Sequence, residues 1–259
     1  MTYLLQSELT VNNGKTVEKN LYETVLLLNV LEQKEEVRII HDKELNVNFN
    51  ESLGFITTYE IELYNINLAL SERLEKASDF TRRLMLRYDY IQPKVNAKGK
   101  VVSVENIKEL RDVWQPLKEN ILEDYEGDSV TDYLKEVEEK MMTQDFILSP
   151  MSQYFYFGLL FPGIPLNHLN GWKTVRNIEI SDYEEEKFQE TVSFDRVVEN
   201  LKLYNISGNT FPNSDFVLEN FSGLVRVKKG EILPVQTDVT INYKINKQRY
   251  QWVFKLEQY

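Results

Sequence analysis

The feature that most constrains the fold is an alternation of apolar and polar residues at both ends of the chain. Near the C-terminus, residues 239–245 and residues 250–256 alternate, and a short polar turn separates them. In the N-terminal part, residues 45–49 and 59–63 show the same spacing. Because successive side chains of a strand point to opposite faces, these runs predict antiparallel strands with one buried face.

The rest of the N-terminal part adds to this strand pattern. Residues 3–11 alternate in the same way, and a turn is expected at residues 12–14. Residues 21–31 and 37–40 are apolar enough to be strands covered on both faces. Residues 1–64 therefore predict an antiparallel meander of about five strands.

A helical period replaces this alternation in the middle of the chain. Apolar residues recur every three or four positions in residues 66–84, 107–121 and 130–141. Such spacing predicts amphipathic helices. Asn106 followed by Glu109 has the form of a capping box for the second helix, which should bend near Pro116. Asp128 or Ser129 is expected to cap the third helix.

Two further segments complete the organisation of the chain. Residues 86–104 predict a hairpin with its turn at residues 96–99. Residues 146–172 combine many aromatic side chains with prolines and glycines, which predicts a short aromatic helix followed by an irregular, apolar crossing. From residue 175 onward the strand patterns return.

Together these elements predict an α+β fold, in which a large, strongly curved, half-barrel-like antiparallel sheet holds the helices on its concave face. Residues 1–64 supply strands, residues 65–161 a mainly helical insertion with one hairpin, and residues 172–259 the remaining strands. No Gly/Ser/Pro-rich linker separates the two sets of strands, and both need their apolar face covered. We therefore expect residues 1–259 to form a single domain.

Four stretches of the sequence carry a resemblance to a known group of proteins. They are the hairpin ending in GKVVSVEN, the following IKELRDVW, the later FPGIPLNHLNGW and residues 223–234. Over residues 86–259 the chain resembles uncharacterised bacterial envelope proteins that have a half-barrel like that of lipoprotein carriers. The resemblance implies a half-barrel fold that holds an apolar ligand in its concave face. This chain differs in having no lipobox cysteine.

Composition and motifs disfavour several classes of function. The chain has no cysteine, and its two histidines, His41 and His168, lack any zinc-binding spacing. A net charge of −11, from 30 Lys and Arg against 41 Asp and Glu, disfavours binding to nucleic acid. Phosphate-binding loops and a nucleophile elbow are also absent. We therefore predict a non-enzymatic protein without catalytic residues, metal or cofactor, with a carboxylate-based hydrolase as a residual alternative.

The sequence also bears on the location of the protein. No stretch reaches the roughly 20 apolar residues that a membrane-spanning helix needs. The N-terminus lacks the basic segment and apolar core of a secretory signal. We expect no membrane span and a cytoplasmic location for the chain as given. A periplasmic or envelope location is the alternative if an N-terminal signal has been removed.

The distribution of charge is more informative than any motif. Residues 105–140 hold 12 Asp and Glu against five Lys and Arg. Concentrated negative charge steers basic partners and repels nucleic acid. This pattern predicts that the helices bind a basic protein partner, such as a toxin or a secretion-system component, in the manner of an immunity or adaptor protein. The expected contact residues are Glu119, Glu123, Asp124, Glu126, Asp128 and Asp132.

A second hypothesis starts from the aromatic segment. Residues 154–157 are four consecutive aromatic residues, which either pack in the core or line a groove. In a half-barrel that holds an apolar ligand, such as a lipid or lipoprotein, the helices would act as a lid. The cavity would then be lined by Phe155, Phe157, Phe161 and Trp172.

Overall fold

The computed structural model describes residues 1–12, 37–69, 75–180, 187–212, 214, 216–245 and 248–259. The predicted strand at residues 21–31, most of the turn at 12–14 and the turn at 246–247 lie outside these residues. The strands are β1 (Thr2–Asn12), β2 (Val37–Leu53), β3 (Ile56–Ala69), β4 (Tyr90–Ile91), β5 (Pro93–Asn96), β6 (Val101–Val104), β7 (Lys173–Glu179), β8 (Lys187–Val198), β9 (Leu201–Thr210), β10 (Phe216–Lys228), β11 (Pro234–Ile245) and β12 (Gln248–Gln258).

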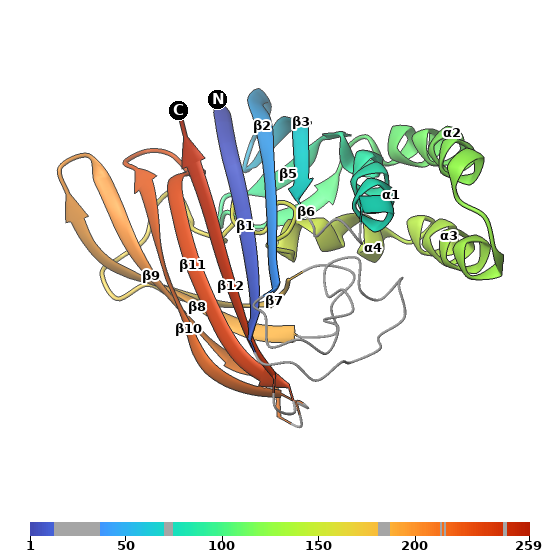
Figure 1. Ribbon diagram of the computed structural model, residues 1–259. Coiled ribbons are helices and arrows are strands. Elements are labelled where there is room, and N and C mark those ends of the chain that lie inside the picture. Colours follow the sequence, from blue (N-terminus) through green and yellow to red (C-terminus); the bar gives the residue numbers. More distant parts are fainter. Residues whose placement is uncertain (13–36, 70–74, 181–186, 213, 215, 246–247) are drawn as a thin grey trace.

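These 12 strands form one antiparallel sheet, so the predicted large antiparallel sheet is confirmed. Its order is β6-β5-β3-β2-β1-β12-β11-β10-β9-β8-β7, and β4 also pairs with β3. The first and last strands are neighbours in the middle of the sheet, where Leu5 of β1 lies opposite Leu256 of β12. Strands from both ends of the chain therefore share one sheet, which curves strongly from edge to edge (Figure 1).

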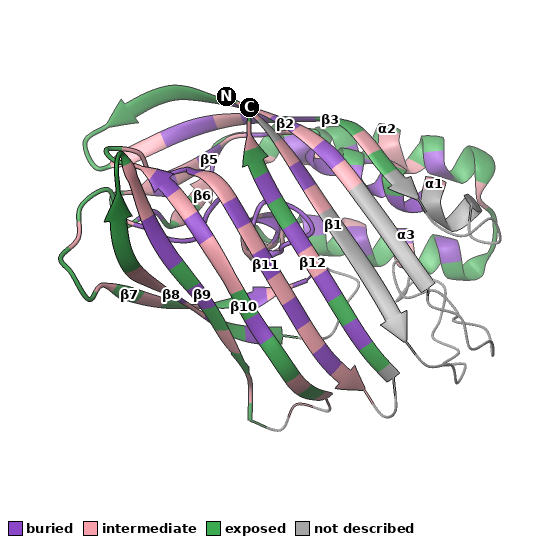
Figure 2. Ribbon diagram, turned by 60° about the vertical axis from the view of Figure 1, so that its left-hand side comes forward, coloured by how far each residue is buried: buried purple, intermediate pink, exposed green. Residues whose placement is uncertain are grey.

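Alternation along the strands decides which side chains are buried. In β12, Tyr250, Trp252, Phe254 and Leu256 are buried and the residues between them are more exposed. Bands of buried and exposed residues follow one another along these strands (Figure 2). Each large apolar side chain contributes about 1.5–3 kcal/mol when it leaves water. The buried faces of strands from both parts of the sequence meet in one hydrophobic core.

The helical pattern predicted from Ile66 onward is partly wrong, because β3 continues as a strand to Ala69. Asn65 has a positive φ of 51°, and the register between β2 and β3 shifts beside it. This is a β-bulge, in which extra residues on one strand oppose fewer on its partner. The bulge moves the following side chains to the other face, so that the apolar spacing no longer follows the period of a strand.

The helical segments are α1 (Glu75–Met85), η2 (Leu86–Tyr88), α2 (Ile107–Asp124), α3 (Asp128–Met141), α4 (Gln144–Leu148) and η3 (Ser149–Ser152). Leu86–Tyr88 is a short 3-10 helix, and the hairpin predicted across residues 86–104 is confined to β5 and β6. None of the helices in the described ranges is long and apolar enough to cross a bilayer.

The predicted capping box does not form at the start of α2. Asn106 precedes the helix, but its side chain accepts a hydrogen bond from the Gln92 amide at 2.8 Å and donates one to the Tyr90 carbonyl at 3.1 Å. The nearby backbone thus competes successfully for the side chain that the helix would need. Pro116 lies inside α2, as expected, and Gly127 rather than Asp128 precedes α3.

The position of the helices differs from the expected one. Helix α1 contacts β3 and α4 contacts β6, whereas α2 and α3 pack against other helical segments and each other. In Figure 1 the helices stand beside the β3–β6 end of the sheet, and α2 and α3 extend away from it. The aromatic segment lies against the concave face instead, and after η3 it is a series of turns rather than a helix.

Residues 153–164 are all buried, and they contact strands from every part of the curved sheet. The Tyr154 ring meets Phe254 of β12 with centroids 5.1 Å apart, and the Phe161 ring meets Tyr59 of β3 at 6.4 Å. Contacts between aromatic edges and faces at these separations are favourable beyond the area that they bury. The chain therefore fills the curve of its own sheet with this segment, called here the crossing segment.

A buried ion pair holds the crossing segment to the sheet. Arg176 of β7 binds Glu190 of β8 at 2.5 Å, and its remaining N–H groups donate to the carbonyls of Phe161 and Gly158 at 2.6 and 2.9 Å. Tyr154 donates its hydroxyl to the same carboxylate. Burial raises the pKa of Glu190 and lowers that of Arg176 to about 9, so each group depends on the other to stay charged.

A second buried cation binds the crossing segment from β2. The Lys43 ammonium donates to the Phe155 carbonyl and lies 5.0 Å from the centroid of the Tyr156 ring. The Phe157 ring is 5.7 Å away from the same ammonium. Aromatic faces attract a cation that has lost its water, which explains how a lysine with no exposed surface is tolerated here.

The crossing segment also lies between the two edges of the sheet, which do not pair with each other. On the β7 side, the Tyr154 amide donates to the Glu179 carbonyl at 3.1 Å and the Phe155 amide to the Ile180 carbonyl at 2.9 Å. On the other side, Gly99 in the β5–β6 turn sits so close to Ile164 that an added Cβ would overlap the Ile164 backbone. The crossing segment thus bridges the open side of the sheet.

Replacing Gly99 by alanine tests this close approach. Gly99 has a φ of 72°, and Gly230, in the β10–β11 turn, has a φ of 87° but open space around it. Both Gly→Ala changes incur the penalty of a positive φ, but only Gly99→Ala also forces the crossing segment to move. We expect Gly99→Ala to lower the free energy of unfolding in urea by about 2 kcal/mol more than Gly230→Ala. Equal losses would show that the two edges are not bridged at Ile164.

Candidate functional site

The acidic residues predicted to bind a partner lie on α2, on α3 and in the loop between them. Leu110, Trp114 and Ile121 are the buried residues of α2, while Val130 and Leu134 begin the buried stripe of α3. These stripes pack inward and leave the polar faces of both helices in solvent. The two helices with their loop, residues 107–141, are called here the acidic hairpin.

Contacts between the two helices make the acidic hairpin a defined surface. Arg111 of α2 donates to the carbonyls of Met141 and Met142 at the end of α3, at 3.2 and 2.7 Å. A cation is favourable at that position, where unpaired carbonyls carry the negative end of the helix dipole. Lys118 of α2 also pairs with Glu138 of α3 at 2.5 Å.

A charged cluster ties the end of the acidic hairpin to α1. Arg83 of α1 pairs with Asp124 at 2.6 Å and with Asp79 at 2.8 Å, and Tyr125 donates to Asp79 at 3.1 Å. Burial opposes ionisation of Asp79, but hydrogen bonds from Arg82 and Tyr125 and the charge of Arg83 outweigh it and lower its pKa. Burial, and then the hydrogen bond to Asp79, raise the pKa of Tyr125 to about 12.

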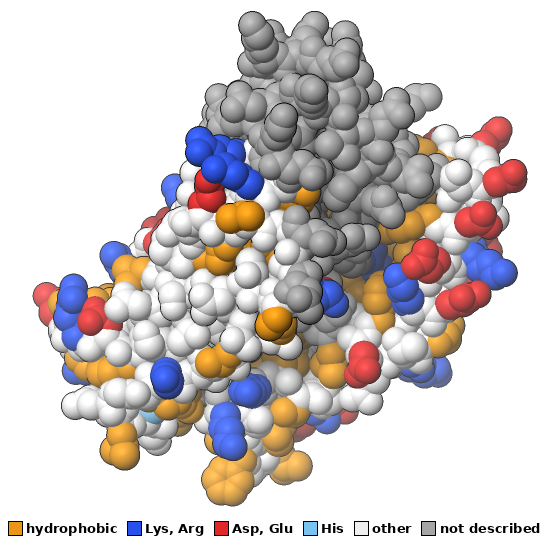
Figure 3. All heavy atoms as spheres, turned by 90° about the horizontal axis from the view of Figure 1, so that it is seen from below, with side chains coloured by type: hydrophobic (Ala, Val, Ile, Leu, Met, Phe, Trp, Pro, Cys, Tyr) orange, Lys and Arg blue, Asp and Glu red, His pale blue; other side chains and the backbone are white. Residues whose placement is uncertain are grey.

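All six predicted contact residues are exposed. Asp124 is the one that pairs with Arg83. The others form no ion pair with any residue in the described part of the chain, and they are Glu119, Glu123, Glu126, Asp128 and Asp132. Figure 3 shows acidic side chains along the helical end of the molecule, with a few basic ones between them. The structure thus brings together acidic groups that internal cations do not neutralise.

The four aromatic residues of the alternative hypothesis lie in two different settings. Phe155 and Phe157 have no exposed surface and pack around Lys43 inside the core. Phe161 is also buried, although it borders a small recess of about 250 Å³. Trp172 is partly exposed and borders a different recess. In the described part of the chain, Phe161 and Trp172 thus border different recesses, while Phe155 and Phe157 lie in the core.

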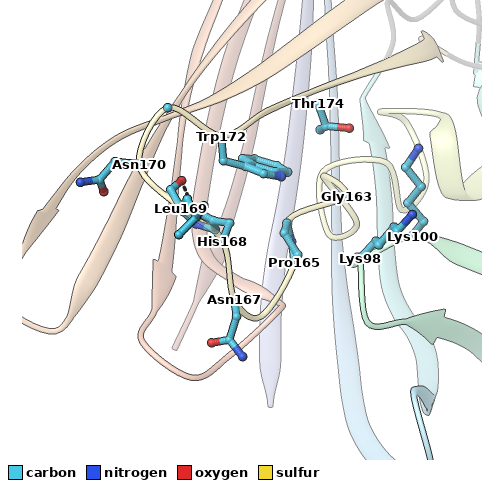
Figure 4. A pocket seen from close by; sticks show the side chains of 11 residues that line it. Lys98, Lys100, Gly163, Pro165, Asn167, His168, Leu169, Asn170, Trp172 and Thr174 are labelled. Atoms are coloured by element: carbon cyan, nitrogen blue, oxygen red, sulfur yellow. Dashed lines mark hydrogen bonds between the residues drawn. The ribbon is translucent and has the colours of Figure 1, made fainter.

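That second recess combines residues whose role the sequence reasoning did not recognise. It has a volume of about 550 Å³ and lies between the β5–β6 turn and residues 163–172 (Figure 4). From the sequence, Lys98 and Lys100 belong only to the predicted hairpin at residues 86–104, and His168 is noted only for lacking a zinc-binding spacing. Sequence spacing carried no signal for their proximity, since about 70 residues separate the two parts of the site.

The described residues also bear on metal and hydrolase chemistry. In the ranges that the structure covers, no group of three or more His, Asp and Glu side chains is placed to hold a metal ion. Glu190, the carboxylate with the most altered environment, has no exposed surface and is bound by Arg176 and Tyr154. It therefore stabilises the fold rather than facing a substrate.

Comparison with known proteins supplies no independent assignment. No protein-family model matches the sequence, and no curated protein matches it either. Any functional inference therefore depends on the geometry and the charge of the chain itself. The two candidate functional surfaces in the described part of the chain are the acidic hairpin and the recess beside Trp172.

The raised pKa of Tyr125 predicts how the acidic hairpin responds to high pH. An unfolded tyrosine ionises near pH 10, whereas folded Tyr125 ionises near 12, so its contribution to stability is complete below pH 10 and lost between pH 10 and 12. We compare the wild type with Tyr125→Phe, which cannot ionise there. The difference in unfolding free energy between them should change in favour of Tyr125→Phe as the pH rises through this window. A difference independent of pH would contradict the raised pKa that burial and the hydrogen bond to Asp79 give to Tyr125.

Proposed function

We propose that the protein is a non-enzymatic, cytoplasmic binding protein whose acidic hairpin docks a basic protein partner. A toxin or a secretion-system component is the kind of partner that we infer, which would make the protein an immunity or adaptor protein of a bacterium. The observation that carries the proposal is a set of exposed acidic residues, of which only Asp124 forms an ion pair within the described part of the chain; the others are Glu119, Glu123, Glu126, Asp128 and Asp132.

Physical considerations support this role for the acidic hairpin. Surface acids usually lie near Lys or Arg, because pairs three or four residues apart stabilise an isolated helix. Here Arg111 binds carbonyls, while Lys118 and Lys140 pair with Glu138 and Glu136 rather than with the six predicted contact residues. Unneutralised acids repel one another, and a basic partner would relieve that repulsion. The acidic residues would also accelerate the encounter with such a partner, over a distance that depends on the ionic strength.

The rest of the chain would then act as a rigid support. The acidic hairpin is connected to the sheet through α1 and α4, which contact β3 and β6. Its acidic faces point away from the core, so the partner could bind without any change in the sheet. Preformed surfaces of this kind pay little ordering entropy when they bind.

Charge reversal of three exposed acids tests the proposal. In the first variant, Glu119, Glu123 and Asp132 all become lysine. The wild-type protein, used as bait in extracts of the source cell, should retain a basic protein, and this variant should lose it. Association of the retained protein with the variant should be slower by at least about tenfold at low salt, with a weaker salt dependence.

A matched control separates the acidic hairpin from net charge. Changing Glu51, Glu62 and Glu257 to lysine alters the net charge equally, and these exposed residues lie on the strands. The control should retain the same protein at nearly the wild-type rate. If both variants lose it equally, or if neither does, the partner does not bind through the acidic hairpin.

An apolar ligand held inside a half-barrel is the second candidate function. The strongly curved sheet with an aromatic interior favours it, as does the resemblance to bacterial envelope proteins, which would place the protein in the periplasm or envelope. A lipid or a lipoprotein chain would have to displace the crossing segment from the concave face. Phe155, Phe157, Phe161 and Trp172 would then line the cavity.

Mass spectrometry distinguishes the second candidate from the first. We expect an organic extract of the purified protein to contain no stoichiometric lipid, because the crossing segment occupies the concave face. Arg176→Leu would release that segment, so its extract serves as a comparison in which an opened cavity could bind lipid. Stoichiometric lipid in the wild-type extract would favour the half-barrel carrier over the partner-binding protein.

A further inference from the structure

The recess beside Trp172 has two walls of different chemistry. On one side stand Trp172, Pro165 and Leu169, and on the other stand Lys98 and Lys100 from the β5–β6 turn. Figure 4 shows the indole reaching into the recess, with the two lysines across from it beyond Gly163. The volume of about 550 Å³ is within the range of small-molecule sites.

Trp172 is held in place by its surroundings. The His168 ring stacks beside the indole with centroids 5.2 Å apart, and the Tyr204 ring meets its edge at 5.8 Å. His168 is itself fixed by a 2.6 Å hydrogen bond between its Nε2 and the Tyr204 hydroxyl. The Trp172 carbonyl accepts from the Phe194 amide at 2.9 Å. An indole fixed in this way binds a second ring with little loss of side-chain entropy.

The turn that carries the two lysines is also rigid. The Asn96 side chain accepts hydrogen bonds from the amides of Lys98 and Lys100, at 2.9 and 3.1 Å. Between them, Gly99 lies directly against the Ile164 backbone. The contact holds the backbone of the turn against residues 163–172, so both lysine side chains start from a fixed place beside the recess.

The charges around the recess have one sign. None of its lining residues is acidic, nor is any lining residue of the adjoining recess of about 250 Å³, which contains Arg176. Neither Lys98 nor Lys100 forms an ion pair with a carboxylate in the residues that the structure describes. Two exposed, uncompensated cations beside a fixed indole stand out in a chain with a net charge of −11.

We propose that this recess binds a small organic anion that carries a flat ring. The ring would pack on Trp172, with Pro165 and Leu169 covering its edges, because aromatic rings at contact distance attract each other and exclude water. The anionic group, a phosphate or a carboxylate, would lie between Lys98 and Lys100. Lysine ammonium groups act there as mobile point charges, which fits a phosphate or carboxylate without fixed bidentate geometry.

The indole N–H signals in a proton–nitrogen NMR spectrum provide the test. The chain has three tryptophans, of which Trp114 and Trp252 are buried, so Trp172 reports the recess and the other two serve as internal controls. The probes are 1-naphthyl phosphate, which has both ring and anion, 1-naphthol, which has the ring alone, and inorganic phosphate. We expect 1-naphthyl phosphate to shift the Trp172 signal in a saturable way. Its affinity should be at least about tenfold higher than that of 1-naphthol or of inorganic phosphate.

Variants separate this site from general electrostatic attraction. The double change Lys98→Gln and Lys100→Gln should lower the affinity for 1-naphthyl phosphate by at least about tenfold. The double change Lys135→Gln and Lys255→Gln removes the same charge from exposed lysines outside the recess and should leave the affinity unchanged. The proposal would be overturned if both double variants lost affinity equally, or if 1-naphthol or inorganic phosphate bound as tightly as 1-naphthyl phosphate. It would also be overturned if the Trp172 signal did not shift at up to about 10 mM 1-naphthyl phosphate.

Discussion

The architecture depends on the way Arg176 holds the crossing segment. Its guanidinium pairs with Glu190 on the neighbouring strand and also donates hydrogen bonds to the carbonyls of Phe161 and Gly158. A sheet of 12 strands that curves without closing leaves an apolar concave face, and something must cover it. Arginine suits the task because its rigid fork can satisfy a carboxylate and backbone carbonyls at once. The cost of burying the charge is offset by neutralising Glu190, which Tyr154 also binds.

Because the crossing segment fills the concave face of the sheet, the candidate binding sites lie elsewhere on the protein. With Phe155 and Phe157 packed around Lys43, the described interior holds structural contacts rather than a substrate site. The acidic hairpin and the recess beside Trp172 lie outside the curve, the first packed on α1 and α4 and the second bordered by the end of the crossing segment. Gly99 touches Ile164 and thereby positions Lys98 and Lys100, so the same segment that fills the core also shapes the recess. Stability and the proposed ligand site are therefore linked through one stretch of backbone.

The sequence was sufficient for the parts of the fold that local patterns determine. Alternation in β11 and β12 identified these strands, and the apolar stripe of residues 107–121 identified α2. It failed where tertiary contacts outweigh local preference. The bulge at Asn65 turned a strand into an apparent helical pattern, and Asn106 bonds to backbone near β4 instead of capping α2. The sequence predicts a short aromatic helix within residues 146–172, yet the amides of Tyr154 and Phe155 donate to the carbonyls of residues 179 and 180, far away in the sequence.

The candidate sites show the same division. Exposure of the acids on α2 and α3 follows from their positions outside the apolar stripes, so these residues could be chosen from sequence. The recess could not, because Lys98, His168 and Trp172 come together only through the packing of Gly99 on Ile164. Likewise, the ion pair between Arg176 and Glu190 left no trace in the spacing of charges. Only the register of β7 with β8, which places Arg176 opposite Glu190, reveals it.

Native-state hydrogen exchange measures whether the crossing segment is a permanent part of the core. The amides of Phe155, Gly158 and Leu160 donate to backbone carbonyls inside the curve. We expect these amides to exchange only through global unfolding, with the same opening free energy as the amides of Ile241 in β11 and Trp252 in β12. Exchange of the crossing segment at least about a hundredfold faster than these strands would show that it opens separately as a lid and is not a permanent part of the core.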